Sequence, residues 1–428
     1  MPTKWKDADF RATAKAATTK PLTYFRPDVA EVNDQMRRFM EGEIRNPTFT
    51  YVNLQDVDFG RMLQALDAYE PTDSVLEVLR GDLLVRRRNA IDLAQAAQAG
   101  DMDRFRLANR AVGFVPEEDL FQSILSSLRG RIEAFHSALG TELEALLPPS
   151  DGRSCLPSLD VFAYAHDAVM AVCEQMRLPT DLKLEGEWVA DDMASMLRQA
   201  FADAGVNDWT VEITSKQTRI STSSTKKIYI PADRKVKARK AFATMAHELI
   251  HAWRWIMGER TGQYLLFTGT AAVPWAEEGV TTVVEQVLLG ADYPGNQDRH
   301  AREDYYLAIS LAEGLIDGER RDFRDVYTIM VAYYRFAEAE LPVEFRSSET
   351  PEERAWIQTN RTFRGSDCQT PGVYWGKDTT YAASNLRIWD AVSSNLSLTQ
   401  YFIAGKFNPA DTTDVATLVA AGLIPDLS

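Results

Sequence analysis

The segment Met245–His251 constrains the fold of this chain more than any other feature, because it contains the pattern H-E-x-x-H. Two residues four positions apart lie on the same side of an α-helix, one turn apart, so both imidazoles can reach a single ion. Glu248 lies beside them, where it can take a proton from a water molecule bound to the metal. The motif therefore predicts a helix that binds a metal ion through His247 and His251, with Glu248 as the general base.

The apolar residues around this motif support the same interpretation. At about 100° per residue, they form one stripe whose centre lies nearly opposite the two histidines. That stripe consists of Phe242, Met245, Leu249, Trp253 and Ile256. The helix is expected to bury one face and to direct the histidines elsewhere. The alternative is a pair of ordinary half-buried histidines with internal hydrogen bonds, although the chain has only five histidines in all.

A catalytic zinc site needs a third protein ligand and an open position for water. Glu278 is the best candidate, because it lies opposite an apolar stripe on the next predicted helix, whereas Glu277 is rotated from it by about 100°. The stripe consists of Val280, Val283, Val284 and Val287. Glu278 could instead be a solvated residue at a helix N-terminus. Glu285, on the same face, either supports a ligating histidine or lies at the surface.

The sequence pattern of the N-terminal half predicts helices, and a small sheet is expected before the metal-binding segment. Apolar residues at three- and four-residue spacing mark the helical segments Val32–Glu43, Ser74–Ala99 and Glu118–Leu147. From about residue 207 the pattern alternates, and it predicts strands at Trp209–Ile213, Thr218–Ser223 and Lys226–Ile230. Because Pro231 ends the third strand, that strand is expected at the edge of the sheet.

The charge and the cysteines exclude some classes of protein. The formal net charge is −15, and an acidic surface repels nucleic acid. The three cysteines form no C-x-x-C pair, so neither a thiolate metal site nor a disulfide framework is indicated. The N-terminal residues lack a signal-peptide core, and no stretch is long and apolar enough to span a bilayer. A cytoplasmic protein without nucleic-acid or membrane partners is the default expectation.

Several of these pieces together resemble known enzymes. A glutamate on a second helix next to H-E-x-x-H resembles the layout of the gluzincin peptidases. Over most of its length the chain also resembles the microtubule-associated tyrosine carboxypeptidases and their bacterial relatives. The matching pieces are Asn46–Tyr51, the His-Glu helix, Glu277–Gly279, Arg361–Gly365 and Gly376–Tyr381. The family usually has H-E-x-x-x-H, with one more residue between its histidines, and a longer interval to the glutamate.

The resemblance implies a carboxypeptidase that removes a C-terminal residue, which is tyrosine in the named family. Such an enzyme needs a cation for the terminal carboxylate, and the matching pieces supply Arg361, Arg364 and Lys377. Tyr381 could donate a hydrogen bond to the tetrahedral oxyanion. Each of these four residues could also have a purely structural or surface role. The family's tubulin substrate is not carried over, because a chain of this charge repels an acidic tail at long range.

The sequence as a whole predicts an α+β protein that is mostly helical and has a zincin-type catalytic domain. Residues 1–205 are expected to form a helical N-terminal portion, and residues 206–428 the metallopeptidase portion. Zn²⁺ is the expected cofactor, and the C-terminus of a peptide or protein is the expected substrate. The alternatives are a metallopeptidase that cuts internally or at the N-terminus, and a non-catalytic peptide-binding module. An intact Glu248 argues against the second alternative.

Overall fold

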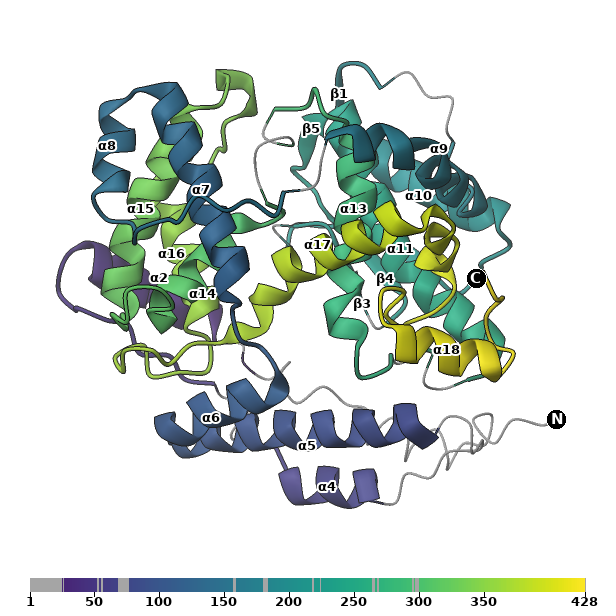
Figure 1. The fold of residues 1–428 in the computed structure, drawn as a ribbon, viewed down its shortest axis with the longest axis horizontal. Coiled ribbons are helices and arrows are strands. Elements are labelled where there is room, and N and C mark those ends of the chain that lie inside the picture. The colour runs from purple at the N-terminus through teal and green to yellow at the C-terminus, as the bar shows by residue number, and fades with distance from the viewer. Residues whose placement is uncertain are drawn as a thin grey trace.

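A computed structural model describes residues 25, 27–51, 54, 57–67, 77–156, 159–179, 184–217, 219–223, 225–263, 266–267, 269–294, 296 and 300–427. Within these ranges the protein is mostly helical and has a small amount of sheet (Figure 1). The α+β class expected from the sequence is therefore confirmed. The predicted helical positions 74–76 and the predicted strand position 218 lie outside the described residues.

The helices of the N-terminal half follow the predicted pattern, and local capping sets their bounds. Asp28 caps the first described helix with its carboxylate, so that helix begins before the expected Val32. The predicted segment Glu118–Leu147 is two helices, because His136 adopts a left-handed backbone conformation and Ser137 caps the next helix. The helices are α2 (Val29–Met40), α4 (Phe59–Asp67), α5 (Glu77–Ala99), α6 (Met102–Val112), α7 (Glu118–Phe135), α8 (Ala138–Glu144), α9 (Leu159–Gln175) and α10 (Ala190–Asp203).

The three expected strands are present as β2 (Thr210–Thr214), β3 (Ser221–Ser223) and β4 (Lys227–Pro231). Their order is β2-β4-β3, with β2 parallel and β3 antiparallel to β4. The expectation that the Pro231 strand lies at the edge is wrong, because β4 is the central strand. Pro231 is the last residue of β4, and the backbone N–H of Ala232 donates to the carbonyl of Thr214 beyond it. The proline thus removes no donor from the strand interior.

Two further short strands and the C-terminal elements complete the fold. The strands β1 (Glu187–Val189) and β5 (Lys235–Lys237), which the sequence pattern did not predict, form a separate antiparallel pair. The remaining elements are α11 (Ala238–Thr261), η4 (Val273–Trp275), α13 (Glu277–Leu289), α14 (Glu303–Glu313), α15 (Phe323–Ala339), η5 (Val343–Phe345), α16 (Pro351–Thr362), η6 (Gly376–Asp378), α17 (Thr379–Ser394), η7 (Leu396–Ile403) and α18 (Thr412–Ala420).

Two large hydrophobic cores organise these elements. One core joins α5, α6 and α7 to α14, α15 and α16, and the other joins α9, α10 and the sheet to α11 and α13. In Figure 1, α7, α14, α15 and α16 lie on the left and α9, α10, α11 and α13 on the right, with α5 and α6 below and α17 running between left and right. The packing therefore does not divide at the boundary expected between residues 205 and 206, because both portions contribute to both cores. Among the described residues, no helix is long and apolar enough to cross a membrane.

Helix α13 is packed tightly between α11 and α17, and Gly279 allows the close approach to α17. A Cβ atom at Gly279 would lie 2.6 Å from the backbone of Ser384, closer than van der Waals contact permits. Since backbone rather than a flexible side chain stands in the way, α13 or α17 would have to move. The glycine therefore fixes the position of the helix that carries Glu278.

We predict that Gly279→Ala lowers the free energy of unfolding by about 1–3 kcal/mol, the usual effect of an overpacked core. Gly130→Ala is the matched control, because Gly130 lies in α7 with open space around its Cβ position. The control should be neutral or stabilised by up to about 1 kcal/mol, since alanine favours a helix. Denaturant titration of both variants measures the difference, and equal stability would contradict the close-packing argument.

Candidate metal centre

The helix that carries the H-E-x-x-H motif is buried along most of its length. The five apolar residues predicted to form its core-facing stripe, Phe242, Met245, Leu249, Trp253 and Ile256, are all buried. His247 and Glu248 are also buried, at 8% and 9% exposure. The motif therefore lies inside the protein, at the contact between α11 and α13, rather than on an open surface.

His247, His251 and Glu278 converge as the sequence predicted. The Nε2 atoms of the two histidines lie 3.7 and 3.8 Å from Oε2 of Glu278. All three side chains offer ligand atoms within 4.8 Å of one another, and no other such group occurs in the described part of the chain. Two donor atoms bound to one tetrahedral zinc ion at about 2.1 Å lie about 3.4 Å apart. The three side chains therefore need only small adjustments to hold a metal ion.

The opposite nitrogen of each imidazole faces a second carboxylate. The Nδ1 atom of His251 lies 3.1 Å from Glu277, and that of His247 lies 3.3 Å from Glu285. A proton on each Nδ1 leaves the lone pair of Nε2 directed at Glu278. Glu285 thus has the supporting position that the sequence left open. The role of Glu277 was missed, because a helical wheel places it away from Glu278 and cannot show what it contacts.

Both supporting carboxylates remain charged in spite of their burial. Burial would raise the pKa of Glu277, but Lys406 and Arg254 hold it well below its ordinary value. Arg254 lies 2.9 Å from Glu277 and its side chain is fully buried. Burial opposes ionisation of Glu285 in the same way, and Lys240, with which it forms an ion pair, lowers its pKa most. Each imidazole is therefore backed by a fixed negative charge.

Glu248 is oriented by the sheet. The hydroxyl of Thr222 in β3 donates to Oε2 of Glu248 at 2.8 Å and lies 2.9 Å from the backbone carbonyl of the same residue. This contact fixes one carboxylate oxygen and leaves the other available. The small sheet thus has a direct connection to the motif, through the edge strand that lies along α11.

Two of the late residues singled out in the sequence lie near Glu278. Burial would raise the pKa of Glu278, but His251 and His247, followed by Lys377 and a hydrogen bond from Tyr381, hold it below its ordinary value. Burial raises the pKa of Tyr381 well above its ordinary range. Its hydroxyl therefore stays protonated and can act as a hydrogen-bond donor.

Arg361 and Arg364 lie further from the metal group. Arg361 forms an ion pair with Asp378 at 2.9 Å and stacks on the ring of Tyr305. Arg364 also acts electrostatically on Asp378. Neither arginine lines the cavity that opens beside His247.

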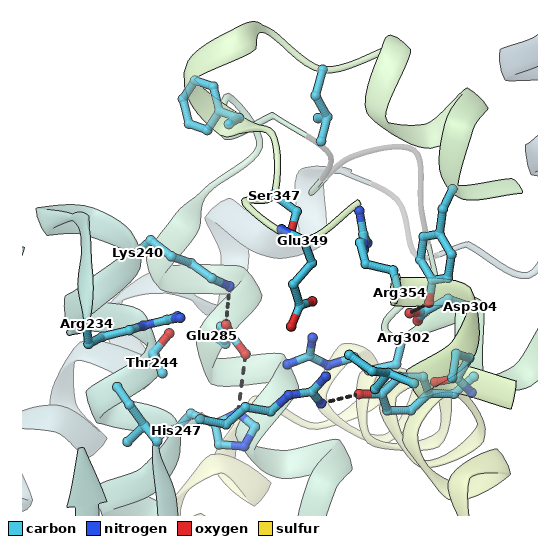
Figure 2. A pocket seen from close by; sticks show the side chains of 18 of the residues that line it. Arg234, Lys240, Thr244, His247, Glu285, Arg302, Asp304, Ser347, Glu349 and Arg354 are labelled. Atoms are coloured by element: carbon cyan, nitrogen blue, oxygen red, sulfur yellow. Dashed lines mark hydrogen bonds and ion pairs between the residues drawn. The ribbon is translucent and has the colours of Figure 1, made fainter. Parts of the chain in front are cut away.

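That cavity has a volume of about 410 Å³ and is lined by His247, which Figure 2 labels, and by Glu248. His251 and Glu278 are not among its lining residues. Elements of both hydrophobic cores form its wall, so it lies where the two cores meet. Five cationic side chains line it. Arg219, Arg234 and Lys240 lie near the sheet and in α11, Arg302 directly precedes α14, and Arg354 is in α16. The sequence patterns gave no sign of this cationic lining, since the residues are scattered over the chain.

Comparisons with family models, curated proteins and solved structures found no match for this chain.

We predict that His251→Ala loses essentially all bound zinc, whereas the unaltered protein binds about one ion per chain, as a catalytic site with three protein ligands does. His166→Ala is the control, because His166 is exposed and its ring lies against Asp167. Metal content after dialysis, measured by mass spectrometry, gives the result. Stoichiometric zinc in the His251 variant would refute the ligand assignment.

The two adjacent glutamates should differ in their effects. Glu278→Ala should abolish zinc binding, because it removes a ligand. Glu277→Ala should weaken zinc affinity by about 10–100-fold, the usual effect of losing a carboxylate behind a ligating histidine. It should also destabilise the fold, since Arg254 loses its buried partner. Zinc titration and unfolding of both variants test this, and equal zinc loss in the two would contradict the assignment.

Proposed function

We propose that this chain is a zinc-dependent peptidase of the zincin type with a gluzincin ligand set, and that it acts as a carboxypeptidase. The observation that carries the proposal is the convergence of His247, His251 and Glu278, of which His247, together with Glu248, lines a cavity. Two imidazoles and one carboxylate are a donor set of catalytic zinc, in which a fourth position is left for water. When bound, zinc would polarise a peptide carbonyl and acidify a water molecule near neutral pH.

Glu248 is the residue proposed to move the proton. It lines the cavity, and the hydrogen bond from Thr222 orients its carboxylate. In this position it can accept the proton of the attacking water through its second oxygen and then donate it to the leaving amine. A module that only bound peptides would have no need of this base.

Tyr381 is proposed to stabilise the oxyanion that forms when water adds to the carbonyl. Its hydroxyl contacts Glu278, and burial keeps it protonated. A donor fixed before the reaction stabilises developing negative charge without reorganisation. The buried stack of Arg361, Tyr305 and Tyr381 holds this side chain in place.

The proposal that the enzyme cuts at the C-terminus of a peptide rests on the sequence resemblance to a carboxypeptidase family rather than on the metal ligands. Pieces such as Arg361–Gly365 and Gly376–Tyr381 resemble the tyrosine carboxypeptidase family. Lys377 and Tyr381 of the second piece act on Glu278, and Arg361 of the first stacks on Tyr305, which packs against Tyr381. An exopeptidase of this kind requires a cation for the free carboxylate. The cationic lining of the cavity meets that requirement.

We predict that Glu248→Gln retains zinc and the fold but loses about 10²–10⁴-fold in kcat, the usual contribution of a general base. Glutamine keeps the shape of the side chain and cannot accept the proton. Glu259→Gln is the control on the same helix, where Glu259 pairs with Lys226 away from the cavity. Comparable turnover in the Glu248 variant would show that the base is another group.

Peptides with a free C-terminus should lose one residue, and the same peptides as C-terminal amides should not. The reason is that the amide lacks the charge that a cationic site binds. Mass spectrometry of a peptide mixture that varies the last residue measures both the cut position and the preferred residue. If free-acid and amidated peptides are cut equally, or if internal bonds are cut first, the protein is an endopeptidase and not a carboxypeptidase.

A further inference from the structure

Three arginines in the cavity form no ion pair among the described residues, although Glu285 and Asp304 act electrostatically on Arg302, and Asp233 on Arg234. Arg219, Arg234 and Arg302 all line the cavity, and none of them forms an ion pair there. The other two cations of the wall are neutralised, since Lys240 pairs with Glu285 and Arg354 with Glu338. Arg219 and Arg234 come from the segment that contains the sheet and Arg302 from the residue before α14, and all three line the cavity together with His247 and Glu248.

Among these arginines, Arg234 shows most clearly the effect of burial without an ion pair. Its Nε atom is buried and has no hydrogen-bond partner among the described residues. Burial lowers the pKa of Arg234, and the positive charge of Arg219 lowers it further. Buried donors are almost always satisfied in folded proteins. An anion between the two arginines would remove the repulsion between them.

Arg302 is held in an unusual backbone conformation. It is the residue before α14, with φ 52° and ψ 43°, in the left-handed region that non-glycine residues rarely adopt. In Figure 2 its side chain extends into the cavity from the side opposite Arg234 and Lys240. A conformation of this kind persists where the surrounding structure imposes it, and it often accompanies a binding site.

Tyr305 connects this group to the metal centre. Arg219 donates a hydrogen bond to the hydroxyl of Tyr305 at 3.0 Å, and the ring of Tyr305 packs edge-on against that of Tyr381. Arg361, which stacks on the same Tyr305 ring, is already committed to Asp378. Two arginines contact Tyr305. Of these, Arg219 lines the cavity and therefore keeps N–H groups that can bind a ligand.

We propose that Arg219, Arg234 and Arg302 form the subsite that binds the C-terminal carboxylate of the peptide, in place of Arg361, Arg364 and Lys377. This inference rests on the proposed carboxypeptidase function. The terminal carboxylate is one residue from the bond to be cut, so its site must lie close to the metal ligands, and these three arginines share a cavity with His247 and Glu248. Guanidinium groups bind carboxylates through paired, charge-assisted hydrogen bonds. Arg361 and Lys377 instead support Asp378, Tyr381 and Glu278 from behind.

The test measures binding without turnover. Zinc-loaded Glu248→Gln protein is titrated with acetyl-Ala-Ala-X peptides, where X is each of the common residues, both as free acids and as amides. The preference for acid over amide is then compared between this protein and versions that also carry Arg302→Asn, Arg302→Lys, Arg234→Gln or Arg361→Gln. Asparagine is chosen because it tolerates the left-handed conformation of position 302. Arg346→Asn is the charge-matched control, since Arg346 is exposed and does not line the cavity.

We expect the acid to bind more tightly than the amide. Arg302→Asn should reduce that preference by about 30-fold or more, which is the lower end for losing a charged hydrogen-bond partner. Arg234→Gln should also reduce it, Arg302→Lys should retain part of it, and Arg346→Asn should leave it unchanged. An unchanged preference in both the Arg302→Asn and Arg234→Gln proteins would overturn the subsite. A loss confined to Arg361→Gln would overturn it equally, and would return the role to Arg361.

The two proposals can fail separately. If the unaltered protein hydrolyses free-acid peptides while the arginine variants keep the acid preference, the enzyme function stands and the subsite is wrong. If no peptide is hydrolysed but the acid preference exists and depends on Arg302, the subsite stands and the peptidase function is wrong. If acid and amide bind equally, the subsite is wrong whatever the protein hydrolyses.

Discussion

The contact between α11 and α13 is the interaction on which the rest of the site depends. Two imidazoles on one helix are matched by three carboxylates on the other, with Glu278 between the rings and Glu277 and Glu285 behind them. Carboxylates are costly to bury unless cations accompany them. Arg254, Lys406 and Lys240 provide that compensation and lower the pKa values of Glu277 and Glu285. The helix pair is thus a neutralised polar network inside a hydrophobic core.

The surrounding fold fixes the positions of α11 and α13 relative to the other residues of the site. Gly279 lets α17 approach α13, and α17 brings Tyr381 to Glu278. On the other side, β3 supplies Thr222 to Glu248. The two hydrophobic cores meet at this point, and the cavity lies at their junction. Ligand sites commonly form at such junctions, because residues from both sides can converge without filling the space.

The cavity holds five cationic side chains beside four carboxylates, whereas the whole protein is strongly acidic. The chain carries a formal charge of −15, yet Arg219, Arg234 and Arg302 line the cavity and form no ion pair among the described residues. Net charge acts over distances that salt screens, whereas a cation within hydrogen-bonding distance acts directly on its ligand. An acidic protein can therefore bind an anionic group in a local site. The overall repulsion affects the rate of encounter more than the final contact.

The sequence by itself determined the features that depend on periodicity within one element. A helix has a fixed turn, so the spacing of His247 and His251, the buried stripe opposite them and the choice of Glu278 over Glu277 could be predicted. The positions of the three strands could be predicted because successive side chains of a strand point to opposite faces, so that polar and apolar residues alternate in the sequence. Only the tertiary structure decided that β4 is central, that Glu277 contacts His251, and that Lys406 lies against Glu277. The arginine lining of the cavity belongs to this second group, because periodicity fixes angles within an element and carries no information on which distant elements pack together.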